Sequence, residues 1–218
     1  TSWEVEYGSF NTRNFHLSHG GMIKDLSYAL GVGAPFTDGP GNRHAGESTM
    51  NLYGSTHWRP NDKLSIRTTL FHINGKRELA HAKSPASNRF QTTDETFDPM
   101  EETFAQMKLF YLMSGKASTE FHVSYSNRDN TFTSTTETAH TSSRDWDHEW
   151  SANLVQSLVL SEHNTIRAGG FYNHWIAPDG KRFYVGRRTD LETFAAVIVD
   201  EHRIGNLFID VGFRWQRT

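Results

Sequence analysis

Twelve histidines are the side chains with the most obvious capacity for chemistry in this sequence of 218 residues. A zinc site needs several imidazole, thiolate or carboxylate groups that converge on one point, and the chain has no cysteine. His16 and His19 lie three positions apart, so on an extended strand they point to opposite faces, and no His-Glu-x-x-His pair occurs. We therefore expect no metal site and interpret the histidines as scattered polar residues of strands and loops.

A second candidate metal-binding group consists of acidic residues at every second position: Asp145, Asp147 and Glu149. If the chain is extended there, the three carboxylates share one face and suit Ca²⁺. A solvated acidic loop is the simpler interpretation of the same residues, and it is the one we favour.

Catalytic motifs are missing from the sequence. No Gly-x-Ser-x-Gly nucleophile elbow occurs, and the lack of cysteine excludes a thiol nucleophile and a disulfide. The run Gly31-Val32-Gly33-Ala34 falls within a strand pattern and opens no helix, so it does not resemble a phosphate-binding loop. The sequence therefore predicts a protein that is not an enzyme and uses no cofactor.

A cationic and aromatic segment at residues 179–188 is the best candidate for ligand contact. It holds four cations and two aromatic residues, a mixture that can hold an anionic, ring-bearing ligand by charge-assisted hydrogen bonds and stacking. Binding of lipopolysaccharide phosphates, or solubility alone, would explain the same composition. The candidate ligand-binding residues are Lys181, Arg182, Tyr184, Arg187 and Arg188.

Overall charge and hydropathy exclude two classes of protein. The formal net charge is −3 and the pI is about 6.4, so no positive field would gather nucleic acid. No stretch approaches the roughly 18 consecutive apolar residues of a membrane-spanning helix. Strands that cross a membrane need only alternate apolar residues, so the low mean hydropathy of −0.63 does not exclude them.

The elements that position these side chains are strands, because apolar residues recur at every second position. The clearest case is the last segment, where Leu207, Ile209, Val211, Phe213 and Trp215 alternate with mainly polar residues. Similar segments along the chain predict about eleven strands in an all-β, antiparallel up-and-down meander. Residues 101–113 also fit a short amphipathic helix, but we favour a strand there.

The connections between these strands alternate in length. Short polar turns are expected at 23–25, 59–62, 114–116, 161–164 and 201–206, and long polar loops at 37–48, 74–103, 127–148 and 177–190. Short turns at one end and long loops at the other are typical of outer-membrane β-barrels. Trp58 near a short turn, and Trp150, Trp175 and Trp215 near long loops, are placed as aromatic girdles at the two membrane interfaces.

Charged residues fix which face of the strands points outward. An Arg or Lys that faced lipid at mid-membrane would cost about 2–4 kcal/mol. We therefore expect Trp3, Leu30, Val123, Leu158, Val211 and Phe213 to face lipid, and Gly31 to lie on the opposite, lumen face. The polar residues expected to face the lumen are Glu4, Glu6, Arg67, Lys108, Glu120, His122, Arg167, Asp210 and Arg214.

Several segments carry a resemblance to a known family. The opening residues 4–14, the strand that ends in Gly20-Gly21 and the segment 26–30 resemble the first barrel hairpins of TonB-dependent outer-membrane receptors. Residues 164–172, 188–192 and 208–215 are similar to mid-barrel strands of the same family. The similarity runs nearly end to end, and it depends on the order of these segments and on the alternation of the loops.

The resemblance implies a partial barrel in the bacterial outer membrane. Such receptors have roughly twenty-two strands and a plug that fills the lumen. Residues 1–218 are then one partial β-barrel domain, the N-terminal half of the barrel, with the plug and C-terminal strands outside this chain. The expected partners are outer-membrane lipid, the plug, the remaining strands, the TonB complex and a small-molecule or metal-chelate ligand. The implied function is import of a scarce nutrient complex, such as a ferric siderophore.

Two alternatives stay open at this point. A passive porin or an adhesin-type barrel has similar strands and needs no plug, and a soluble β-sandwich binding module also alternates polar and apolar residues. An odd number of strands would not close a bacterial barrel, and an open edge cannot face lipid. We therefore expect that the chain alone does not close.

Overall fold

The computed structural model describes residues 1–41, 43–83, 89, 92–178 and 188–218. Within that part the regular secondary structure consists of eleven strands, and no helix is long and apolar enough to span a membrane. The strands are β1 (Ser2–Tyr7), β2 (Arg13–Ile23), β3 (Leu26–Thr37), β4 (Glu47–Asn61), β5 (Leu64–Leu79), β6 (Asp94–Ser114), β7 (Ala117–Thr135), β8 (His140–Ser161), β9 (Asn164–Ala177), β10 (Thr189–Ile204) and β11 (Leu207–Arg217).

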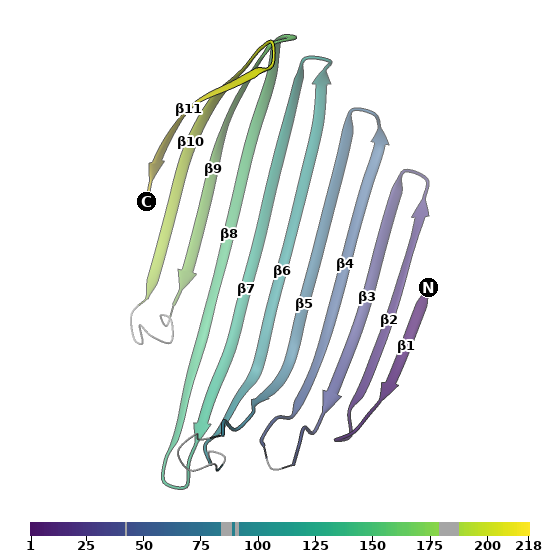
Figure 1. Ribbon diagram of the computed structural model, residues 1–218, viewed down its shortest axis with the longest axis vertical. Helices are drawn as coiled ribbons and strands as arrows, with labels where there is room; N and C mark the ends of the chain where they lie inside the picture. Colours follow the sequence, from purple (N-terminus) through teal and green to yellow (C-terminus); the bar gives the residue numbers. More distant parts are fainter. Residues whose placement is uncertain (42, 84–88, 90–91, 179–187) are drawn as a thin grey trace.

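All eleven strands form one sheet in chain order, and each strand pairs antiparallel with the next (Figure 1). The predicted all-β meander of about eleven strands is therefore confirmed. Residues 101–113 lie inside β6, as the strand interpretation expected. Strands β1 and β11 each have one neighbour, so the sheet has two open edges.

The connections at the two ends of the sheet differ in length, as the sequence predicts. At one end each turn has two residues, whereas at the other the chain makes longer connections (Figure 1). The short turns are 24–25, 62–63, 115–116, 162–163 and 205–206, and the longer connections are 8–12, 38–46, 80–93, 136–139 and 178–188. We call these the short-turn end and the long-loop end.

Two expected long loops are wrong in extent. The loop expected at 74–103 is confined to 80–93, because β5 continues to Leu79 and β6 begins at Asp94. Residues 127–148 are almost entirely strand, because β7 continues to Thr135, β8 begins at His140 and only 136–139 connect them. The error arose because this segment is polar on both faces, so it lacks the alternation that marks a half-buried strand. Backbone pairing in register continues there without it, from Asn127 opposite His148 to Thr135 opposite His140.

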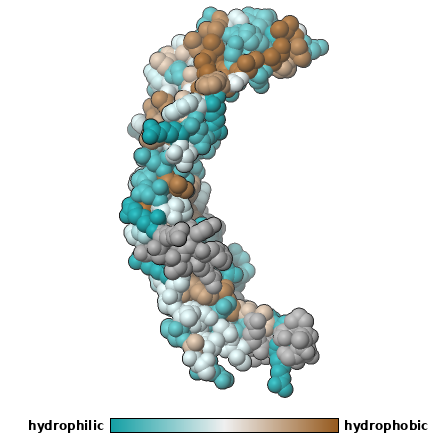
Figure 2. Space-filling model, turned by 90° about the vertical axis from the view of Figure 1, so that its left-hand side faces the viewer, coloured by the Kyte–Doolittle hydropathy of each residue, from teal (hydrophilic) through white to brown (hydrophobic). Residues whose placement is uncertain are grey.

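Strands β4 to β10, with 14 to 22 residues each, are longer than a membrane requires. Strand β8 has 22 residues, whereas a tilted strand crosses a bilayer with about 9–11. Seen from the side of β11 the sheet is an arc, and apolar side chains gather at its upper end, near the short turns (Figure 2). The long-loop half of the sheet is mostly polar in this view.

A single curved layer leaves almost no buried core. In the described part of the chain, the buried apolar residues are Phe132, Ala177 and Ala195, and the large apolar side chains are mostly exposed. In water such a surface would be unfavourable, since its burial is worth about 25 cal/mol per Å². The face of the sheet that carries the exposed apolar side chains therefore has to be covered by a nonpolar environment.

Candidate functional site: the polar face and the long-loop end

Polar side chains from neighbouring strands meet on one face of the sheet. Arg67 lies opposite Lys108, and Lys108 lies opposite His122, so the three form a row across β5, β6 and β7. Together with Glu120 they line a hollow of about 540 Å³. His122 is also within hydrogen-bond distance of Gln106, with 3.3 Å between Nε2 and Oε1.

The remaining charged residues lie on this same face. Glu120 is followed across the sheet by Val155, Gly169, Val197 and Arg214 in direct register. The Arg167 Nε is 3.3 Å from an oxygen of Glu201, and Glu201 lies opposite Asp210. Near the other edge, Glu6 accepts a hydrogen bond of 2.8 Å from Asn14, and Glu4 lies opposite His16.

The structure thus brings all nine expected lumen residues to one face, which we call the polar face: Glu4, Glu6, Arg67, Lys108, Glu120, His122, Arg167, Asp210 and Arg214. The opposite face, which we call the apolar face, holds Trp3, Leu30, Val123, Leu158, Val211 and Phe213. Trp3 is 73% exposed and Phe213 is 68% exposed. Val211 and Arg214 are on opposite sides of β11, as alternation requires.

A row of aromatic rings crosses the apolar face between its apolar and polar parts. Tyr125 and Trp150 have ring centroids 4.5 Å apart, and those of Tyr172 and Phe194 are 4.9 Å apart. The next residues on this face, toward the long-loop end, are polar on all four strands: Asn127, His148, His174 and Glu192. The aromatic row therefore ends the apolar belt.

Trp175 does not belong to this row, contrary to the sequence expectation. It lies opposite Glu149, on the polar face, and its Nε1 donates a hydrogen bond of 2.8 Å to Asp147 Oδ2. A position near a long loop does not fix the face, since a step of one residue reverses it. Trp150 and Trp58 lie on the apolar face, at the long-loop and short-turn sides respectively.

Most of the candidate ligand loop lies outside the described residues, including Lys181, Arg182, Tyr184 and Arg187. Arg188 is described, and its Nη2 is 3.0 Å from Asp190 Oδ2. The other carboxylate oxygen of Asp190 is 2.7 Å from His174 Nε2. These hydrogen bonds, first from His174 and then from Arg188, lower the pKa of the Asp190 carboxyl from its usual value.

A second charged pair lies beyond the aromatic row, between β7 and β8. Arg144 donates two hydrogen bonds to Asp129, one of 2.7 Å from Nε and one of 2.5 Å from Nη2. This two-armed geometry stabilises the carboxylate and lowers the pKa of Asp129 from its usual value. The pair joins β7 and β8 in a region where both faces of the sheet are mostly polar.

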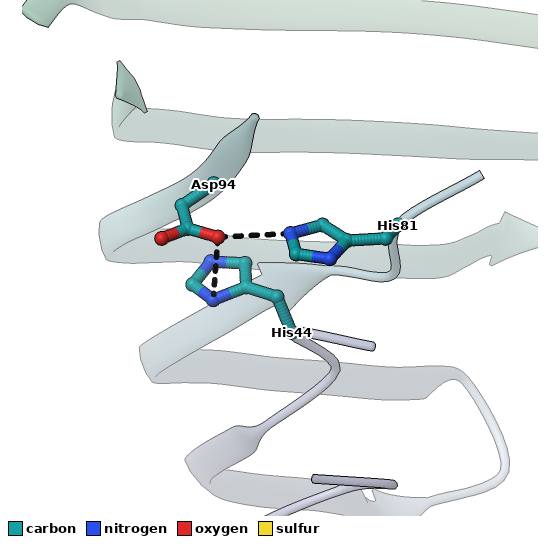
Figure 3. Close-up of side chains that lie close together, drawn as sticks. All are labelled: His44, His81 and Asp94. Carbon is teal, nitrogen blue, oxygen red and sulfur yellow. Dashed lines mark hydrogen bonds and ion pairs between the residues drawn. The ribbon is translucent and has the colours of Figure 1, made fainter. Parts of the chain in front are cut away.

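The structure also assembles a group that the sequence did not reveal. His44, His81 and Asp94 offer ligand atoms that lie within 4.8 Å of one another (Figure 3). They come from two long-loop-end connections and the start of β6, so no local spacing connects them. The acidic residues Asp145, Asp147 and Glu149 follow one face of β8, and within the described ranges the His44 group is the only cluster that could hold a metal.

Comparison with solved structures shows which fold this sheet resembles. It matches FpvA of P. aeruginosa, solved with a bound ferric pyoverdine, with a TM-score of 0.69 and 9% identity over 98% of this chain and 36% of that one. It matches the ferric-catecholate import receptor Fiu of E. coli with a TM-score of 0.67 and 11% identity over 97% of this chain and 40% of that one. The RagAB peptide transporter gives a TM-score of 0.56 and 8% identity over 94% of this chain and 32% of that one.

The comparisons establish the fold. The chain spans roughly a third of the length of the structures it matches, and it has the fold of part of a TonB-dependent receptor barrel, as the sequence resemblance implied. No protein-family model matches the sequence. No curated protein matches it either.

Proposed function

We propose that this chain is part of the barrel of an outer-membrane receptor that imports a scarce nutrient complex, such as a ferric siderophore. The observation that carries the proposal is the eleven-strand meander, whose polar face is charged and whose apolar face ends at a row of aromatic rings. Its fold is similar to that of siderophore receptors. The function of the whole protein is binding and transport, not catalysis.

The orientation of the two faces follows from the cost of charge in hydrocarbon. Arg67 and Lys108 lie side by side at the depth of the apolar belt, since their strand neighbours Ile66 and Leu109 belong to that belt. Each cation would cost about 2–4 kcal/mol if it faced lipid at the bilayer midplane. The polar face therefore lines the water-filled or plug-filled lumen, and the apolar face contacts lipid.

The open edges support a larger assembly. Strands β1 and β11 leave unpaired backbone groups that lipid cannot satisfy, so further strands of the same protein complete the barrel. A barrel of more than about twenty strands has a lumen wide enough for a plug domain. In this proposal a plug meets the polar face, and the TonB complex supplies energy through a region outside this chain.

The long-loop end is the outer, ligand-capturing end in this proposal. Barrels of this kind have short periplasmic turns and longer extracellular loops. The cations Lys181, Arg182, Arg187 and Arg188, with Tyr184, then face the medium and attract an anionic complex. Arg188 forms an ion pair with Asp190, and its side chain is 61% exposed, so in this proposal it can also contact a ligand.

The test is uptake of radiolabelled ferric siderophores by cells that carry or lack the full-length protein. Active import predicts uptake that depends on the protein, saturates at low concentration and stops when an uncoupler collapses the proton gradient. A passive porin would show uptake that neither saturates nor responds to the uncoupler. Radiolabelled peptides are tested in the same cells. If the protein imports peptides but not siderophores, and the uncoupler stops that import, the siderophore assignment is wrong and the cargo is a peptide.

A further inference from the structure

The strongest unassigned feature is the cluster of His44, His81 and Asp94 at the long-loop end (Figure 3). Asp94 Oδ1 is 2.8 Å from His81 Nε2 and 3.7 Å from His44 Nδ1. The two imidazole rings are stacked, with centroids 5.4 Å apart and 15° between their planes. Both histidines are mostly buried, with exposed fractions of 20% and 13%.

The nitrogen of His44 that faces the cluster makes no hydrogen bond to either carboxylate. Its Nδ1 is 3.7 Å from Asp94 Oδ1 and 3.6 Å from Glu78 Oε2, and both distances are too long for one. Its other nitrogen, Nε2, is 3.0 Å from the Thr96 hydroxyl. A proton on Nε2 that is donated to Thr96 leaves Nδ1, the nitrogen nearer to the two carboxylates, unprotonated and free to bind an ion.

This arrangement is the one that metal-ligating histidines use. Such a histidine donates its second ring N–H to an outer oxygen, which fixes the tautomer and the ring orientation. Glu78 lies outside the group of three ligands, next to His44, and its Oε2 accepts a hydrogen bond of 2.9 Å from Gly46 N. Lys76 Nζ lies 3.9 Å from the other oxygen of Glu78, which further occupies that carboxylate.

The backbone holds the two connections that carry the histidines close together. His81 N donates to Arg43 O at 2.6 Å, and Glu78 N donates to Gly46 O at 2.8 Å. His44 itself has a φ of +47°, in the left-handed region that non-glycine residues rarely adopt. His44 and His81, which are 37 positions apart in the sequence, are thus held as neighbours before any ion binds.

We propose that His44, His81 and Asp94 form a binding site for a transition-metal dication of the Zn²⁺ class. Two imidazoles and one carboxylate, with a fourth position for water, are a zinc-type donor set, whereas Ca²⁺ and Mg²⁺ require mostly oxygen ligands. Ligands of a tetrahedral zinc, at about 2.0–2.2 Å, lie about 3.4 Å apart. On binding, the 2.8 Å contact between His81 Nε2 and Asp94 Oδ1 opens slightly, the 3.7 Å distance from Asp94 Oδ1 to His44 Nδ1 closes slightly, and the two stacked imidazole rings turn so that both face the ion.

The bound ion would fasten the connection 38–46 to residue 81 and to the start of β6. Three strands, β4, β5 and β6, begin or end beside it at the long-loop end. The site is therefore structural, and it does not depend on the import function proposed above. It is also separate from the cationic segment that holds Arg188, which follows β9.

The experiment is zinc titration of the full-length protein in detergent, after chelation, by calorimetry. It compares wild type with His44→Gln, His81→Gln and Asp94→Asn. The matched control is His174→Gln, because His174 also pairs with an aspartate at the long-loop end, at 2.7 Å from Asp190, but without a second histidine. Co²⁺ substitution supplies a second readout, since a tetrahedral or five-coordinate site gives intense visible absorption.

We expect one zinc ion whose affinity falls by more than about 100-fold in each ligand variant and is unchanged in the control. Thr96→Val removes the oxygen that contacts His44 Nε2. It should weaken zinc affinity by about 10- to 100-fold, while all three ligands and the Co²⁺ spectrum are retained. This variant keeps the test valid if a ligand variant fails to fold. Equal zinc affinity in wild type and all cluster variants, or no binding by wild type, would overturn the proposal.

Discussion

Tyr125 and Trp150 stack across β7 and β8 at the level where the apolar face of the sheet ends, with ring centroids 4.5 Å apart. On the short-turn side of this pair lie Val123 and Ala152, and on the long-loop side lie Asn127 and His148. Aromatic rings suit this position because their bodies are apolar while Tyr and Trp carry a polar group. The pair therefore marks the end of the apolar belt, which contacts lipid in the proposed barrel.

The first prediction concerns this pair. A double-mutant cycle with Tyr125→Ala and Trp150→Ala, measured by unfolding in lipid bilayers, should give a coupling energy of about 0.5–1.5 kcal/mol. The stacked geometry is the reason, since aromatic contact contributes beyond burial alone. Strict additivity of the two substitutions would show that the rings are independent.

The second prediction compares neighbouring residues on the two faces. Leu154→Arg, on the apolar face within the belt, should destabilise the folded barrel by about 2–4 kcal/mol in a bilayer and impair its assembly. Asn153→Arg, one residue away on the polar face, should have a much smaller effect. Heat-modifiable mobility on gels measures assembly of both variants. Equal loss in the two would contradict the assignment of the faces.

The third prediction concerns pH. Because the folded-state pKa of Asp129 is lowered, its ion pair with Arg144 contributes stability at neutral pH. That contribution is fully present above the unfolded pKa of about 3.9 and is lost as pH falls through the lower folded pKa. Arg144→Gln should return the Asp129 pKa toward its usual value, as carboxyl carbon chemical shifts would show. An unchanged titration in this variant would remove Arg144 as the cause.

The fourth prediction tests the cationic loop. Changing Lys181, Arg182, Arg187 and Arg188 together to Gln should slow association with an anionic ligand, most at low ionic strength, and leave dissociation nearly unchanged. Exposed charges act mainly on encounter, since they are screened within about 8–10 Å at physiological salt. The control neutralises four exposed cations of the short-turn end, Lys24, Lys63, Lys116 and Arg203. Association rates that do not differ between the two sets would leave the loop with no capture role.

Alternation along the chain was sufficient to predict most of the architecture. The opposition of Val211 and Arg214 follows from a period of two, and the short turns follow from their turn-forming residues. Residues 127–148 could not be assigned in this way, because a strand that is polar on both faces has no periodic signal. Trp175 shows the same limit, since its face depends on register and not on its distance from a loop.

The cluster of His44, His81 and Asp94 lay beyond prediction for a different reason. Its members are distant in sequence, and the meander brings them together only because alternate connections emerge at the same end of the sheet. A search for local metal-binding spacings therefore misses it. A comparison of all histidines within the long-loop-end connections could have found it.

The most direct test of the proposed barrel uses two adjacent residues of β7, His122 and Val123. A spin label at a single introduced cysteine, in the full-length protein in bilayers, reports its accessibility to oxygen in lipid and to a water-soluble nickel complex. We expect the label at Val123 to be accessible to oxygen and the label at His122 to the nickel complex. Equal water accessibility at both positions, or the reverse pattern, would contradict a membrane barrel with its charged face inward.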